Sequence, residues 1–103
     1  MKQVVHGKLY DTETAEKIAY FTNEASNSDF GYIRETLYRT KNGAWFLRGE
    51  GGAATQYAEV YAAGKGRSAG EEIIPLDDDE VKNWLELHRK CEVHEKYFVV
   101  EPA

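Results

Sequence analysis

The feature that most constrains the fold is the dipeptide Asn42-Gly43, which lies between two short runs rich in apolar and aromatic residues. These runs cover residues 37–40 and 44–48, and three glycines follow within residues 49–52. Asn and Gly tolerate the positive φ angles of a tight turn whose twist matches that of the flanking strands. The sequence therefore predicts a β-hairpin, with large apolar groups on both faces of its second strand.

Length and composition indicate a folded domain. A chain of 103 residues can bury a hydrophobic core, and seven Tyr, four Phe and two Trp exclude the apolar-poor composition of a disordered protein. The single cysteine, Cys91, cannot form an internal disulfide, no run approaches the roughly 20 apolar residues of a membrane helix, and the N-terminus lacks the apolar core of an export signal. We therefore expect a cytoplasmic protein without a membrane partner.

Periodicity and turn residues predict most other elements. We expect strands within residues 4–10, 71–74 and 96–100, a helix over 13–22, and loops over 23–31 and 64–70. Residues 53–63 fit a short helix, although Tyr57, Glu59 and Tyr61 also alternate as in a strand.

A further helix begins after Asp77. Asp77 and Glu80 have the spacing of a capping box, and Leu76 and Val81 have that of a hydrophobic staple. Its predicted apolar stripe contains Val81, Trp84, Leu85 and His88, with Cys91 next on the same side. The order of elements predicts an α+β fold: one domain over residues 1–103, with a largely antiparallel sheet of four to five strands and two main helices on one face.

Charge is divided unevenly along the chain. Residues 1–52 contain seven basic and seven acidic residues, whereas 53–103 contain six and eleven, so the net charge of −5 belongs to the second half. An acidic surface repels nucleic acid and suits a basic partner, such as a nucleic-acid-binding protein. The alternative is a solvated acidic face that aids solubility.

No pattern for catalysis or cofactor binding is present. His88, Cys91 and His94 are zinc-type ligands, but on a continuous helix His94 lies about 120° around the axis from His88, which favours structural roles over a metal site. Neither glycine-rich segment has the spacing of a phosphate-binding loop, although Lys65 and Arg67 leave room for an anion near the second. We predict a non-enzymatic protein with no cofactor and no metal.

The hairpin region combines aromatic and basic residues, notably Tyr38, Trp45 and Arg48. If exposed, they would form an interface hot spot or stack on bases. A sheet with many aromatic residues is more often simply core, which is the interpretation we favour.

Three segments, GKLYDTETAEKIA, ETLYRTKNGAWFLRGEGGAATQYAE and IIPLDDDEVKNWLE, resemble a family of small, mostly uncharacterised proteins of bacterial mobile elements. The resemblance covers residues 7–87. It implies a phage or plasmid protein, and some proteins of that kind are anti-CRISPR inhibitors that bind a Cas effector.

From the acidity and this resemblance we predict an inhibitor that blocks a nucleic-acid-binding surface of a host protein complex without binding nucleic acid itself. Glu71, Glu72, Asp78 and Asp79 would imitate phosphates. The alternative is a small-molecule or nucleotide-binding module, with its ligand between the hairpin and residues 64–70. A strand over 96–100 would also offer an edge for a homodimer.

Overall fold

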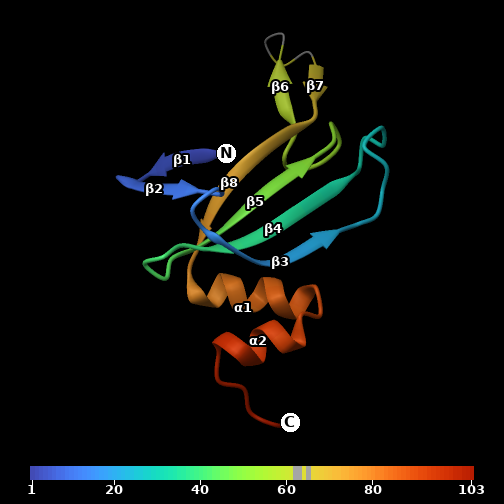
Figure 1. Cartoon of the computed structure of the whole chain (residues 1–103). Coiled ribbons are helices and arrows are strands. Elements are labelled where there is room, and N and C mark those ends of the chain that lie inside the picture. Colours follow the sequence, from blue (N-terminus) through green and yellow to red (C-terminus); the bar gives the residue numbers. More distant parts are fainter. Residues whose placement is uncertain (62–63, 65) are drawn as a thin grey trace.

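The structure is a computed structural model that describes residues 1–61, 64 and 66–103. Within that part of the chain, a four-stranded antiparallel sheet in the order β3-β4-β5-β8 carries two helices, and two small hairpins, β1-β2 and β6-β7, project from it (Figure 1). The predicted α+β class is confirmed. The elements are β1 (Lys2–Val5), β2 (Lys8–Asp11), β3 (Glu16–Thr22), β4 (Ile33–Arg39), β5 (Trp45–Gly51), β6 (Glu59–Tyr61), β7 (Gly66–Ser68), β8 (Gly70–Leu76), α1 (Asp78–Leu87) and α2 (Cys91–Tyr97).

The predicted hairpin is confirmed as β4 and β5, with Leu37 opposite Leu47 and Arg39 opposite Trp45. Its turn differs from the expected one. Gly43 has a φ of 85°, whereas Asn42 is not in the positive-φ region. The amide of Thr40 donates to the Ala44 carbonyl at 2.8 Å, so the loop has three residues and uses glycine alone for the left-handed position.

The helix predicted over residues 13–22 is wrong, because this segment forms strand β3. Asp11 accepts the Glu13 amide at 2.9 Å, but it closes a local turn instead of capping a helix. Ala19 and Phe21 lie opposite Leu37 and Glu35 of β4. Aromatic residues pack well on a pleated surface, and here pairing with β4 outweighs the helical spacing of the apolar residues.

Two further expectations are corrected in the middle of the chain. Turns and strand β6 replace the helix expected over 53–63, whose residues 62 and 63 lie outside the described part. Strands β7 and β8 occupy most of the expected loop over 64–70, of which residue 65 is likewise outside. The strand expected over 71–74 is confirmed within β8. Pro75 lies inside β8, which is tolerated because β8 is an outer strand of the sheet.

The single strand expected within residues 4–10 is instead the hairpin β1-β2. His6 and Gly7 form its turn with φ angles of 50° and 78°. Positive φ at both central positions is the geometry of the tightest hairpin turns.

Helix α1 begins as predicted. The Asp77 side chain accepts the Glu80 amide at 2.8 Å, and the Glu80 side chain accepts the Asp77 amide at 3.0 Å. The helix ends after Leu87, where Arg89 adopts a φ of 57° and the amide of Lys90 donates to the Leu85 carbonyl at 2.8 Å, which is a Schellman-type stop.

The strand expected over residues 96–100 is wrong, because the first two of these residues complete helix α2. Tyr97 and Phe98 pack on Trp45 with ring centroids 5.2 and 5.9 Å apart. This tertiary contact outweighs the β preference of the segment. It removes the edge strand that was expected to offer a place for pairing between two chains.

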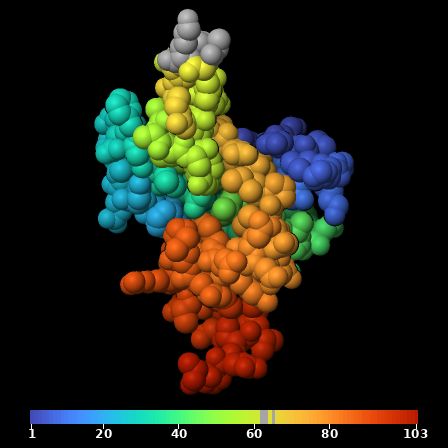
Figure 2. All heavy atoms as spheres, turned by 180° about the vertical axis from the view of Figure 1, so that it is seen from behind, coloured from blue at the N-terminus to red at the C-terminus, as the bar shows by residue number. Residues whose placement is uncertain are grey.

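Each face of the sheet has its own core. The helix-side cluster contains Leu37, Trp45, Leu47, Val81, Trp84 and Leu85. The opposite cluster contains Tyr10, Tyr38, Phe46 and Ile73 and is covered by the β1-β2 hairpin. Seen from behind, the helices and C-terminal residues form one end of the molecule, while β1 and β2 lie beside β8 (Figure 2).

Candidate functional site

The structure places the predicted aromatic residues in the core. Tyr38 is 8% exposed and stacks on Phe46, whereas Trp45 is 4% exposed in the cluster on the other face. Neither ring is available to a partner on the surface, so for these two residues the core interpretation holds. The sequence did not indicate which aromatic rings are buried, because large apolar residues lie on both faces of β5.

Arg48 and Glu71 lie on the sheet face opposite the helices and belong to a ladder of alternating charges. Arg34 pairs with Glu50 at 3.5 Å. Arg48 approaches Glu50 at 3.9 Å and Glu71 at 2.5 Å. Because Arg48 balances its charge, Glu71 is a weak imitation of a free phosphate.

The other three predicted acids lie elsewhere. Glu72 is opposite Gly49 on the helix-side face, whereas Asp78 and Asp79 occupy the first turn of α1. The four carboxylates therefore form no single surface. Asp78 and Asp79 alone belong to the helical end of the molecule.

A buried polar cluster around Glu35 was not predicted. One oxygen of Glu35 accepts the Trp84 indole N–H at 3.0 Å, and the other accepts the Tyr57 hydroxyl. His88 Nε2 lies 3.6 Å from Glu35 and its ring stacks on Phe21 with centroids 3.8 Å apart. Glu35 is 8% exposed, so these donors provide the solvation that a buried carboxylate requires.

Burial in this cluster shifts the pKa values of Tyr57 and His88. Burial, reinforced by Glu35, raises the pKa of Tyr57 well above its ordinary value. Burial lowers the pKa of His88, although Glu35 opposes this effect. The groups bond to one another inside the protein, which indicates that they join the sheet, the loop before β6 and α1.

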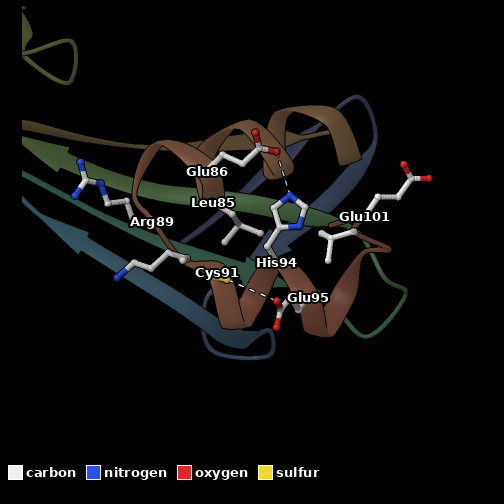
Figure 3. A pocket seen from close by; sticks show the side chains of 9 residues that line it. Leu85, Glu86, Arg89, Cys91, His94, Glu95 and Glu101 are labelled. Atoms are coloured by element: carbon white, nitrogen blue, oxygen red, sulfur yellow. Dashed lines mark hydrogen bonds and ion pairs between the residues drawn. The ribbon is translucent and has the colours of Figure 1, made fainter. Parts of the chain in front are cut away.

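A hollow on the helical layer lies between α1, α2 and the C-terminal residues and has a volume of about 520 Å³ (Figure 3). Val100, which is 46% exposed, supplies apolar surface, and the buried Leu85 lies behind the lining. The charged and polar side chains around them are Glu86, Arg89, Lys90, Cys91, His94, Glu95 and Glu101. In Figure 3, Arg89 lies at the opposite end of the hollow from Glu101.

Within this hollow, the side chains form separate pairs. His94 Nε2 lies 3.1 Å from Glu86 Oε2, and the Cys91 thiol lies 3.7 Å from Glu95. The Glu95 carboxylate raises the pKa of the Cys91 thiol, which lowers the fraction of nucleophilic thiolate at neutral pH. His94 Nδ1 is buried and has no hydrogen-bond partner within the described residues.

The zinc-type residues do not converge. His88 points into the core, Cys91 is exposed at the start of α2, and His94 pairs with Glu86. Across residues 1–61, 64 and 66–103, no group of three or more His, Cys, Asp or Glu side chains is arranged to hold a metal ion.

The place predicted for a nucleotide also contains a hollow, of about 250 Å³. It is lined by Tyr32, Glu50, Glu59, Ala69, Gly70 and Glu71. Three carboxylates at this position repel phosphate, so the geometry does not favour a nucleotide there.

Comparison of the chain with protein-family models, with curated proteins and with solved structures finds no match. The resemblance to proteins of mobile elements therefore stays a prediction. In the described part of the chain, no helix has the length and apolar character needed to span a membrane.

Proposed function

We propose that the protein is a non-enzymatic binding protein whose helical layer docks on a basic surface of a partner protein. One observation carries the proposal: residues 77–101 contain eight acidic and four basic residues, and all eight acidic residues are exposed. Most of the net charge of −5 is thus gathered at one end of the molecule (Figure 2). Complementary charge of this kind accelerates encounter and selects the partner.

The hollow on this layer supports a partner that presents lysine or arginine. The long apolar stem of such a side chain would contact Val100, while its charged head would reach the carboxylate of Glu95 or Glu101. Val99 and Leu87, which are 96% and 74% exposed, add apolar surface on the same layer. Exposed apolar residues rimmed by charge are typical of protein-binding surfaces.

The partner we propose is a nucleic-acid-binding protein of bacterial defence, specifically a Cas effector. Surfaces that attract phosphates also attract an array of carboxylates, so the bound protein would exclude nucleic acid. In this proposal Asp78 and Asp79 contribute to the docking layer, whereas Glu71 and Glu72 do not.

The test compares two triple variants with the same change in net charge. The first, Glu92→Gln with Glu95→Gln and Glu101→Gln, alters the helical layer. The matched control, Glu13→Gln with Glu24→Gln and Glu59→Gln, alters exposed acids elsewhere. Asp77 and Glu80 are kept, because their loss would damage the cap of α1.

Binding to a purified Cas effector is measured at two salt concentrations, together with inhibition of DNA cleavage. We expect the helical-layer variant to bind at least about tenfold more weakly and with a smaller salt dependence, since each removed charge contributes to the complementary field. The control variant should bind like the wild type. Equal weakening by both variants, or no binding by the wild-type protein, would overturn the proposal.

A further inference from the structure

Arg39, the last residue of β4, lies opposite Glu16 of β3 but forms no ion pair with it. Its Nε atom is buried and has no hydrogen-bond partner in the described part of the chain, and no ion pair between the described residues includes it. Arg34, near the other end of the same strand, pairs with Glu50 at 3.5 Å. A guanidinium group has five N–H donors, and a buried donor without an acceptor is costly. An anion beside the guanidinium group would balance its positive charge.

Two aromatic rings hold the Arg39 side chain. Its guanidinium carbon lies 4.9 Å from the centroid of the Trp45 ring and 5.3 Å from that of Tyr97. These rings meet edge to face, and Trp45 is almost fully buried. Cation–π contacts fix the position of the charge but provide no hydrogen-bond acceptor. The group is thus preorganised, while its Nε–H has no acceptor among the described residues.

Beside Arg39 is a hollow of about 340 Å³, at the end of the sheet where β3 begins and β4 ends. It is lined by Thr14, Ala15, Glu16, Arg39, Thr40 and Lys41. Lys41 adds a second cation and Thr40 adds a hydroxyl group, whereas the Thr14 hydroxyl donates to the Asp11 carbonyl at 3.5 Å. Thr40 Oγ1 already accepts the Ala44 amide at 3.0 Å, so its O–H can donate in another direction. Glu16 is the one carboxylate in this lining and opposes an anion.

We propose that this hollow binds a phosphate group, held by Arg39 and Lys41 as cations and by the Thr40 hydroxyl as a donor. Phosphate is favoured over a carboxylate because two cations face the hollow and phosphate carries between one and two negative charges near neutral pH. This site shares no lining residue with the hollow between α1 and α2, and the proposal does not rest on the proposed function.

The experiment is an NMR titration of the ¹⁵N-labelled protein with inorganic phosphate at constant ionic strength, with sodium acetate as the second arm. We expect a saturable shift of the Arg39 Nε–H signal and of the Thr14 and Thr40 amides, with a millimolar dissociation constant, and a much smaller response to acetate. Absence of a saturable shift, or an equal response to both anions, would overturn the assignment.

Four variants test the residues. Arg39→Gln should abolish the response of the Thr14 amide, whereas the matched control Arg34→Gln should leave it unchanged. Because Arg39 also packs on Trp45, two surface variants keep the test independent of folding. Lys41→Gln should weaken phosphate binding about threefold and Glu16→Gln should strengthen it about threefold, as expected for partly exposed charges. Equal affinity of the wild type and both surface variants would refute the proposed site.

Discussion

Replacing Tyr57 by phenylalanine removes one hydroxyl group from the buried cluster around Glu35. The ring itself stays in place over Gly49, where a glycine is required because a Cβ atom would overlap the ring. Glu35 keeps the indole N–H of Trp84 at 3.0 Å but loses its second donor. The substitution therefore isolates a single hydrogen bond to a buried carboxylate.

The loss of stability expected for Tyr57→Phe follows from the burial of the carboxylate that accepts the hydrogen bond. A hydrogen bond to a charged group contributes about 1.5–3 kcal/mol, and little packing is lost with one oxygen atom. We expect the free energy of unfolding to fall by about 2 kcal/mol. For a domain near 100 residues this lowers Tm by roughly 10 °C and the urea midpoint by about 1 M.

Urea unfolding followed by tryptophan fluorescence measures the change. Tyr20→Phe is the matched control, because Tyr20 is 45% exposed on β3 and its loss of a hydroxyl should change stability by less than about 0.5 kcal/mol. A loss of stability in Tyr57→Phe no larger than that of Tyr20→Phe would refute the view that Glu35 depends on this donor.

The remaining predictions concern His88 and two glycines. Burial, opposed by Glu35, lowers the pKa of His88 below its ordinary value of 6.5, so the unfolded chain binds the proton more tightly and the free energy of unfolding falls as the pH drops below about 6.5. His88→Gln should reduce that loss when urea midpoints are compared near neutral and at mildly acidic pH; an unchanged pH dependence would exclude His88 as its source. Gly49→Ala should destabilise by about 1–3 kcal/mol because the new methyl group overlaps Tyr57. Gly7→Ala, where the added Cβ meets open space but φ is 78°, should cost only about 1 kcal/mol, and the opposite order in thermal unfolding would contradict the packing argument.

Sequence reasoning succeeded where neighbouring residues determine the structure. The β4-β5 hairpin is specified by a glycine turn between strand-forming runs, and α1 is specified by the Asp77–Glu80 cap and the stripe of Val81, Trp84 and Leu85. These signals act over a few residues, so they can be read before any tertiary contact is known. The acidic second half was equally visible, but its concentration on the helical layer was not.

The errors arose where local preference and tertiary contact disagree. Residues 16–22 have a helical spacing of apolar groups but pair with β4, and Tyr97 has strand propensity but ends a helix that packs on Trp45. The hollow between α1, α2 and the C-terminal residues could not be predicted without knowing the position of α2, whose residues line it. For the Arg39 hollow, the sequence offered only an arginine at the end of a strand.

The amino-acid sequence by itself determined the α+β class, the central hairpin, the start of α1 and the sign of the charge, because each depends on composition or on residues close along the chain. The tertiary structure decided which charges are balanced. Glu35 receives donors from residues 22 and 49 positions away, and Arg48 pairs with Glu71 on the neighbouring strand. Arg39 contacts two aromatic rings and forms no ion pair with any described residue. Electrostatic balance depends on distance in space, and only the folded chain sets those distances.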